Sequence, residues 1–196
     1  MLIHGDDASG NCLKIKYTAD YLGLGYEWRA VDIMKGEART AAFLEINPMG
    51  QVPAVTLDDG RHLAQSNAII RYLARGTALM PEDAYLQAKV DELMFWEQYS
   101  HEPYVGTCRF QMRYLGKSRE ERDAWRVERG ERALDFMENQ LESKDWFVGG
   151  ELSIADIALL AYTRVADEGG FDMASRKNIV NWIGRCEEKL AIAPRH

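Results

Sequence analysis

The sequence has few cysteines, and they form no recognisable pattern. Cys12, Cys108 and Cys186 are odd in number and widely spaced, which fits neither a disulfide framework nor the paired ligand spacing of a zinc site. No stretch approaches the roughly 18 apolar residues that a bilayer-spanning helix needs. The first seven residues include the acidic pair Asp6 and Asp7 and lack the apolar run of a signal peptide. We therefore expect a cytoplasmic protein with no metal and no membrane partner.

Basic residues are also fewer than acidic ones. The chain has 24 Lys and Arg against 31 Asp and Glu, for a formal net charge of −7. Nucleic acid binding needs a basic surface for the phosphates, so we expect no nucleic acid partner. A small anionic ligand needs only a local pocket and is not excluded. The 196 residues correspond to one large domain or two small ones, enough to bury a core without disulfides.

The first seventy-odd residues alternate short strand and helix patterns. Cys12, Ile15, Ala19 and Leu22 share one helical stripe, and Gly23 follows where a helix-ending glycine belongs. Apolar runs flank an Asp-Gly pair that suits a hairpin turn. The patterns predict strands at 2–4, 27–32, 55–57 and 61–63, and helices at 11–22, 40–44 and 66–74. The resulting order, β-α-β-α-β-β-α, implies one parallel pair and an antiparallel edge.

After Arg75 the pattern changes to helices alone. Gly76 and Pro81 bracket a connector, so we expect domains at residues 1–76 and 82–196. Helices are predicted at 83–99, at 118–141 behind a capping box of Ser118 and Glu121, after Ser153, and at 178–189. The helix after Ser153 is apolar almost all round, which is typical of the middle of a helical bundle.

Four segments carry a family resemblance: Ser9-Gly10-Asn11-Cys12, Val52-Pro53, Gln65-Ser66, and Ser153 to Asp156. Together they resemble the glutathione S-transferase family, specifically its bacterial cytosolic members with a serine-type N-terminal motif. The resemblance runs over nearly the whole chain. It implies an α/β thioredoxin-like N-terminal domain, an all-α C-terminal domain, glutathione as co-substrate, a homodimer and a role in detoxification.

The resemblance assigns the glutathione sulfur to the start of the first helix. Only a thiolate is a good nucleophile, and a hydroxyl donor at a helix N-terminus can stabilise it. Ser9 matches the serine that donates to the sulfur, and Asn11 matches an asparagine that some bacterial members use. Ser9 as a plain N-cap is the alternative. Cys12 lies on the apolar stripe, and we interpret it as a core residue.

The loop at 47–53 is expected to hold the middle of the tripeptide. The resemblance implies a cis bond between Val52 and Pro53, with the Val52 backbone pairing with the cysteinyl backbone like an added strand. Gln51 matches a position that reaches the glycyl carboxylate. Arg39, or less directly Lys35, falls where the family often places a basic side chain over the same group. A solvated surface charge is the alternative for Arg39.

Gln65 and Ser66 match the pair that binds the γ-glutamyl end. Ser66 at a helix N-terminus offers a hydroxyl, a backbone N–H and the helix dipole to the γ-glutamyl carboxylate. Gln65 replaces the glutamate of many bacterial members, so it can accept from the ligand ammonium but supplies no charge. Plain helix capping is the alternative interpretation of this pair.

The electrophile is expected between the domains, beside an aromatic and Met-rich stretch that includes Tyr104 and Phe110. Core and dimer contacts are the alternative for these side chains. The predicted function is attack of the glutathione thiolate on a hydrophobic electrophile. A glutathione-dependent disulfide reductase or peroxidase is a second hypothesis. The third is a non-catalytic interaction module, because a fold does not fix a function.

Overall fold

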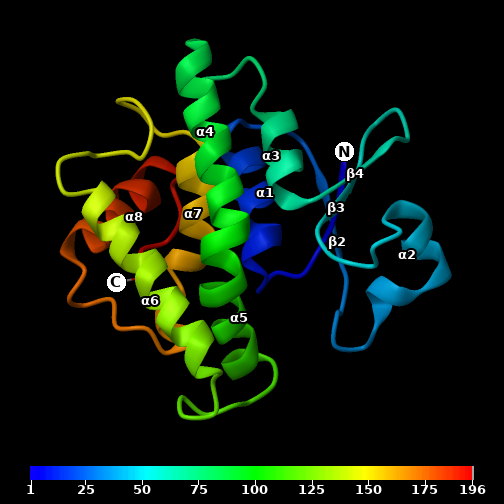
Figure 1. The fold of residues 1–196 in the computed structure, drawn as a ribbon. Coiled ribbons are helices and arrows are strands. Elements are labelled where there is room, and N and C mark those ends of the chain that lie inside the picture. Colours follow the sequence, from blue (N-terminus) through cyan, green and yellow to red (C-terminus); the bar gives the residue numbers. More distant parts are fainter. Residues whose placement is uncertain (196) are drawn as a thin grey trace. The chain divides into compact units, whose positions relative to one another are not determined.

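The computed structural model describes residues 1–195, and His196 lies outside the described residues. The chain divides into two compact units, Met1–Thr77 and a second unit that begins at Ala78. Figure 1 shows a sheet with helices in the first unit and a group of helices in the second. The predicted fold class, a thioredoxin-like domain followed by an all-helical domain, is confirmed.

The first unit is built on a four-stranded sheet in the order β2-β1-β3-β4. β1 runs parallel to β2, and β3 runs antiparallel to both β1 and β4. The order of elements matches the prediction from sequence, and their bounds are β1 (Leu2–Gly5), α1 (Gly10–Tyr21), β2 (Glu27–Ala30), η1 (Glu37–Arg39), α2 (Ala41–Ile46), β3 (Ala54–Thr56), β4 (His62–Ala64) and α3 (Ser66–Leu73).

Helices α1 and α3 lie on one face of the sheet and α2 on the other (Figure 1). The predicted stripe of α1 is buried, with Cys12, Ile15 and Ala19 all 0% exposed. Gly23 follows the helix with φ of 64°, a conformation that glycine adopts without a steric penalty. The helical spacing of the apolar residues and the glycine after them therefore located α1 and its end to within one residue.

The face covered by α2 contains a buried histidine. His4 packs edge-on against Phe43 with ring centroids 6.1 Å apart. Its Nε2 lies 3.1 Å from the Thr56 hydroxyl, which lies 3.0 Å from Nδ1 of His62. Burial, helped by Arg29, lowers the pKa of His4 and so favours the neutral imidazole. This polar chain ties β1, β3 and β4 together on one face.

Strand β2 differs from its prediction in length and burial. It ends at Ala30 rather than at residue 32, and three of its four residues, Ala30 among them, are exposed. β2 is an edge strand. The chain turns away after it, and the Asp32 carboxylate accepts the backbone N–H of Met34 in this turn. Trp28 is the residue that packs inward, over Gly5. A Cβ at Gly5 would lie 2.8 Å from the indole ring, so the close approach requires glycine.

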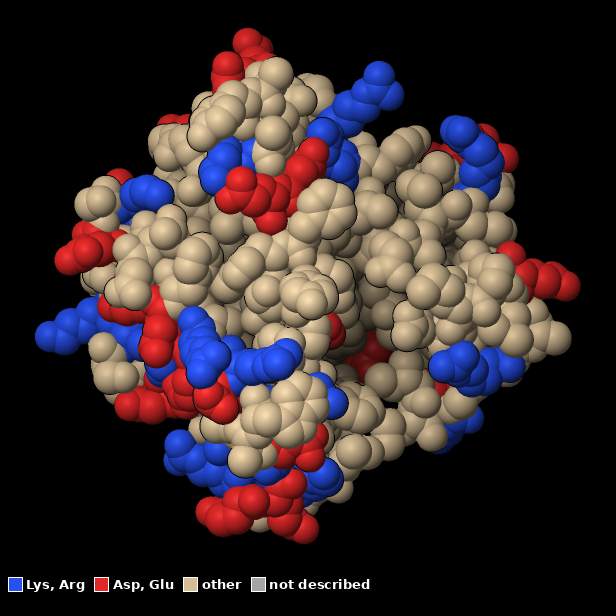
Figure 2. All heavy atoms as spheres, viewed as in Figure 1, with Lys and Arg blue, Asp and Glu red and all other residues tan. Residues whose placement is uncertain are grey.

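The second unit consists of helices, and residues 78–195 contain no strand. Charged side chains of both signs intermingle on the molecular face drawn in Figure 2. No helix within residues 1–195 is both long and apolar enough to span a membrane. The elements of this unit are α4 (Ala84–Trp96), η2 (Glu97–His101), α5 (Glu102–Arg113), α6 (Ala124–Gln140), α7 (Ile154–Thr163), η3 (Ala166–Gly169) and α8 (Lys177–Lys189).

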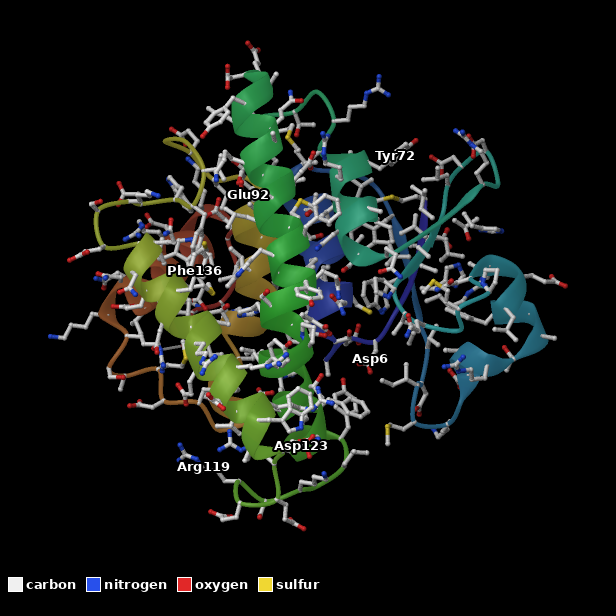
Figure 3. The ribbon with its side chains drawn as sticks, viewed as in Figure 1. Asp6, Tyr72, Glu92, Arg119, Asp123 and Phe136 are labelled. Carbon is white, nitrogen blue, oxygen red and sulfur yellow. The ribbon has the colours of Figure 1, made fainter. Side chains whose placement is uncertain are left out.

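The predicted start of α6 is wrong. Ser118 donates its backbone N–H to Glu121 at 2.8 Å, as a capping box requires, but the chain forms only a turn there. The helix has Asp123 as its N-cap (Figure 3). The Asp123 carboxylate accepts from Gln111 of α5 at 2.9 Å. The same oxygen accepts from Arg126 in the first turn of α6 at 2.8 Å, so the helix starts at a residue held by α5 and by its own first turn, and not at the capping pattern of Ser118.

Helix α8 has no cap of its own, and a side chain of α6 supplies one. The two oxygens of Glu138 accept the backbone N–H groups of Asn178 and Ile179, at 3.0 and 2.9 Å. The N-cap residue of α8, Arg176, makes no side-chain cap bond. A carboxylate here satisfies two otherwise orphan donors and interacts favourably with the helix dipole.

Helix α7 is buried along its whole length, as its apolar sequence predicts. A capping box opens the helix: Asp156, 0% exposed, accepts from the backbone N–H of Ser153 at 3.0 Å. The same carboxylate accepts from the Ser153 hydroxyl, the Phe147 backbone N–H and the Trp182 indole N–H, at 2.9, 3.1 and 3.0 Å. Burial raises the pKa of Asp156, and these donors act in the opposite direction. One carboxylate thus joins α7, α8 and the loop before α7.

Replacing Asp156 by Ala should destabilise the protein severely. Four donors would lose their acceptor in a buried site, which costs about 3 kcal/mol or more of unfolding free energy. Urea unfolding followed by circular dichroism measures the change. Asp145→Ala is the matched control, because the Asp145 side chain is 78% exposed. Equal loss in both variants would contradict the role of Asp156 as the shared acceptor of these donors.

Cys12 should resist alkylation in the native protein. Burial raises its pKa to about 11, against smaller opposing effects of hydrogen bonds from the Asp6 backbone and the Ser9 side chain. At pH 8 only about 0.1% of such a thiol is thiolate, the form that reacts with iodoacetamide. Peptide mass spectrometry after native labelling should find Cys12 unmodified, whereas labelling in urea should modify it fully. Rapid native modification would show that Cys12 is not a core residue.

Candidate functional site

The register of the sheet brings the predicted glutathione residues to one edge of the first unit. β1 and β3 are antiparallel, with His4 opposite Ala54, so the segment before Ala54 lies beside the segment after β1. Ala54 is also opposite Ala64, the last residue of β4. The turn that leads to α1, the bend before β3 and the start of α3 therefore meet at this edge.

The turn before α1 presents Ser9. Asp6 shapes this turn by accepting the backbone N–H of Ala8 on its carboxylate at 2.8 Å and that of Ser9 on its carbonyl at 3.0 Å. Figure 3 marks Asp6 just ahead of α1. Ser9 occupies the N-cap position with extended backbone, but its side chain makes no cap hydrogen bond. Ser9 is thus the N-cap residue, as the alternative interpretation expects, while its hydroxyl hydrogen-bonds the Cys12 thiol rather than a backbone N–H of the helix. A role of Ser9 toward the glutathione sulfur stays a prediction.

Asn11 and Ser66 meet across the two helix N-termini. The Ser66 hydroxyl donates to Oδ1 of Asn11 at 3.0 Å, although the residues are 55 apart in sequence. Ser66 is 3% exposed and begins α3, and Asn11 lies in the first turn of α1. Two helix N-termini side by side favour negative charge through their dipoles and free N–H groups. The site is thus suited to an anionic ligand.

Lys14 is a site residue that the sequence analysis missed. It is 0% exposed, and its ammonium donates to Oδ1 of Asn67 at 3.2 Å and approaches the Ser66 hydroxyl at 3.5 Å. A signal was present in the sequence. Asn11, Lys14 and Thr18 recur at positions i, i+3 and i+7, a polar stripe on a helix whose neighbouring stripe is apolar. Thr18 is also buried and donates to the Lys14 carbonyl at 2.8 Å.

The loop before β3 has the expected cis bond between Val52 and Pro53. Within residues 1–195, the backbone N–H and C=O of Val52 have no hydrogen-bond partner, so both are available to a peptide-like ligand. The buried Asn47 holds the loop by donating to the Gln51 carbonyl at 2.7 Å and accepting the Met49 N–H at 3.1 Å. The side chain of Gln51 is exposed beside this bend.

Arg39 braces the same loop from outside. Its guanidinium donates to the Met49 carbonyl at 3.1 Å and lies against Gly50. Gly50 has φ of +61°, and a Cβ there would come within 2.7 Å of the guanidinium. The contact explains both the glycine and the place of Arg39 at the loop. A contact of Arg39 or Gln51 with a carboxylate stays a prediction.

Gln65 adopts an unusual backbone conformation directly before α3. Its φ is 69°, one of two positive values among the non-glycine residues in the described part of the chain. Such conformations cluster at ligand sites, where the surrounding structure holds them in place. The exposed Gln65 amide lies 3.6 Å from the Met49 sulfur, a weak contact. The backbone of Gln65 therefore supports a binding role more strongly than its side-chain contacts do.

Tyr104 and Phe110 belong to α5 of the second unit. The Tyr104 hydroxyl accepts from Arg129 at 2.8 Å, and its ring meets Trp125 edge-on at 6.1 Å. Phe110 is 36% exposed and stacks on Tyr114 at 5.0 Å. Both rings are thus partly engaged with neighbours of their own unit. Their predicted role toward an electrophile stays a prediction.

Comparisons with known proteins agree over both units. The family profile "Glutathione S-transferase, N-terminal domain" matches residues 8–75, and "Glutathione S-transferase, C-terminal domain" matches residues 95–189. A glutathione S-transferase structure from Pseudomonas fluorescens is 46% identical, with TM-score 0.94, covering 98% of this chain and 97% of that one. A second structure, from Xanthobacter autotrophicus, is 39% identical, with TM-score 0.90, covering 95% and 92%.

A curated relative from an insect gives the same family. Glutathione S-transferase D7 of Anopheles gambiae is 27% identical over 184 residues, 91% of this chain and 82% of that protein. Both domains of the chain thus match one family, in the same order and over nearly the full length. The chain belongs to the glutathione S-transferase family and is an enzyme of that family.

Proposed function

We propose that this enzyme activates the glutathione thiol at Ser9 for attack on a hydrophobic electrophile. The observation that carries the proposal is the sheet register, which places the start of α1, the Val52 bend and the start of α3 at one edge. A tripeptide with a carboxylate at each end and a thiol in the middle needs three such groups of donors and acceptors. In the reaction, the thiolate forms a bond to the electrophilic carbon, and a leaving group departs with its electron pair.

Ser9 is proposed to donate a hydrogen bond to the sulfur, with Asn11 as a second donor. Ser9 stands at the N-terminus of a twelve-residue helix, and its hydroxyl does not cap that helix. A hydroxyl donor and the helix dipole both favour the thiolate over the thiol. Glutathione supplies the reactive atom, while the protein lowers the thiol pKa and fixes its position.

The remaining contacts are assigned to the ends of the tripeptide. The Val52 backbone and Pro53 bend are proposed to hold the cysteinyl backbone. Gln65 and Ser66 are proposed to bind the γ-glutamyl end. Gln51 and Arg39 border the loop and are proposed to reach the glycyl carboxylate.

The proposal also covers the electrophile site, the oligomeric state and the cellular role. Tyr104 and Phe110 are candidates to line the electrophile site, because aromatic side chains suit apolar substrates. Homodimer formation is supported by large exposed aromatics on and just after α4, where Tyr85, Phe95 and Tyr99 are 70%, 77% and 81% exposed. A cytoplasmic location and a role in detoxification complete the proposal.

A glutathione-dependent disulfide reductase or peroxidase is the second candidate function. The feature that supports it is Asn11, a second polar side chain in the first turn of α1 beside Ser9. A reductase that used Cys12 as its own nucleophile is disfavoured, because burial raises the pKa of that thiol to about 11. Turnover of cumene hydroperoxide measured beside turnover of 1-chloro-2,4-dinitrobenzene decides between the two activities. A folded protein that binds no glutathione by calorimetry would instead support a non-catalytic module.

Replacing Ser9 by Ala should lower kcat for 1-chloro-2,4-dinitrobenzene. A hydrogen bond to a charged group contributes about 1.5–3 kcal/mol, so a loss of tenfold to a hundredfold is expected. The apparent pKa of the bound thiol, read from the pH profile of kcat, should rise by about one to two units. KM for glutathione should change little. Ser143→Ala, at an exposed position, is the control, and an unchanged pH profile in Ser9→Ala would exclude Ser9 as the donor.

Replacing Gln65 by Glu should tighten glutathione binding. A carboxylate accepts from an ammonium in a charge-assisted bond, which is stronger than the neutral bond that an amide offers. We expect Kd to fall about threefold to tenfold at low ionic strength, with the gain shrinking as salt is added. Titration calorimetry at two salt concentrations measures both effects. Weaker binding at low salt would show that Gln65 does not face the ammonium.

A further inference from the structure

The side chain of Lys14 is buried between the N-terminal halves of α1 and α3. It is 0% exposed, which is rare for lysine, since removing an ammonium from water is costly unless its hydrogen-bonding groups are engaged. Its ammonium contacts the first two residues of α3, donating to Oδ1 of Asn67 at 3.2 Å and approaching Oγ of Ser66 at 3.5 Å. A buried positive charge thus lies next to Ser66, which is proposed to bind the γ-glutamyl end of the ligand.

The hydrogen bonds that start from this ammonium have a defined direction. An ammonium only donates, so Ser66 receives its hydrogen bond as an acceptor. The Ser66 hydroxyl has a single hydrogen, and that hydrogen goes to Oδ1 of Asn11 at 3.0 Å. The nearby charge also favours the carbonyl end of the Asn11 amide over its NH2 end on this side. The result is a chain from Lys14 through Ser66 to Asn11.

The chain determines which way Asn11 presents its amide. The oxygen and nitrogen of an amide lie at opposite ends of the group, so holding Oδ1 toward Ser66 turns the Nδ2 donors away from it. Ser66 in turn keeps its backbone N–H at the start of α3, while its hydroxyl hydrogen is occupied by Asn11. Both helix N-termini are therefore organised by one side chain that lies beneath them.

We infer that Lys14 is the positioning residue of the glutathione site. It fixes Ser66 and Asn67 at the γ-glutamyl end and, through Ser66, orients the Asn11 amide as a donor toward the sulfur. The inference deepens the proposed function and rests on it. The ligand class is defined by the charges involved, since a γ-glutamyl carboxylate and a thiolate both gain from a nearby buried cation.

Two variants at this position separate positioning from packing. Lys14→Met keeps the length and apolar stem of the side chain but removes the charge and the donors. Lys14→Arg keeps a cation with several donors. The matched control is Lys16→Met, on the same helix, where the lysine side chain is 42% exposed and pairs with Asp20 at 2.9 Å.

Two measurements report on the two ends of the ligand. Calorimetry with S-methylglutathione measures binding without thiol ionisation, and we expect Lys14→Met to raise Kd about tenfold. The pH dependence of thiolate absorbance near 240 nm measures the ionisation of bound glutathione, and its apparent pKa should rise by about one unit. Lys14→Arg should restore both values to within about threefold, and Lys16→Met should leave both unchanged.

A third measurement works without any ligand. The side-chain amide resonances of Asn11 in a 1H–15N spectrum should shift in Lys14→Met and stay near wild type in Lys16→Met. Unchanged Asn11 resonances would overturn the hydrogen-bond chain whether or not the protein binds glutathione. If the wild type fails to bind glutathione, the proposed function falls, and the resonances still decide on the chain itself.

The remaining outcomes are also decisive. A folded Lys14→Met with unchanged Kd and thiol pKa would assign Lys14 to packing alone and overturn the inference, while the proposed function would stand. If Lys14→Met fails to fold, Asn67→Ala takes its place, because it keeps the charge and removes one acceptor of the ammonium. That variant should raise Kd for S-methylglutathione about threefold, and unchanged binding would overturn the inference.

Discussion

The antiparallel pairing of β1 with β3 is the constraint on which the first unit depends. With His4 opposite Ala54, the chain leaves β1 toward Ser9 at the point where Pro53 enters β3. A shift of one residue would turn every side chain of the strand to the other face of the sheet. It would exchange Ile3, which is 0% exposed, with His4, which packs against Phe43 on the opposite face, and move the Val52 bend away from α1. Site geometry and core packing are therefore fixed by the same hydrogen bonds.

The sequence predicted most of the fold because its signals are local. The apolar stripe of α1, the Asp-Gly turn between β3 and β4 and the uniformly apolar α7 each depend on neighbours within a few residues. The prediction failed at Ser118, where a sound capping pattern forms only a turn. There, Gln111 holds Asp123 at 2.9 Å, and α6 begins beyond it. The hydrophobic periodicity of a segment carries no information on which other helix packs against it.

The candidate site was predicted from motifs, and its supporting layer was not. Ser9, Val52 and Ser66 follow from a family resemblance, but Lys14 was overlooked because a lysine on a helix is normally interpreted as a solvent-facing charge. Its burial depends on α3, more than fifty residues away, where Ser66 and Asn67 receive its hydrogen bonds. A sequence gives the residues that touch a ligand more readily than those that hold them in place.

The cap that Glu138 provides to α8 has a consequence for the order of assembly. The carboxylate comes from 40 and 41 residues upstream of the N–H groups that it satisfies, and α8 offers no substitute of its own. The residues of α6 are synthesised before those of α8, so the acceptor is already in the nascent chain when the last helix emerges from the ribosome. The two N–H groups at the start of α8 therefore meet an acceptor that was synthesised before them.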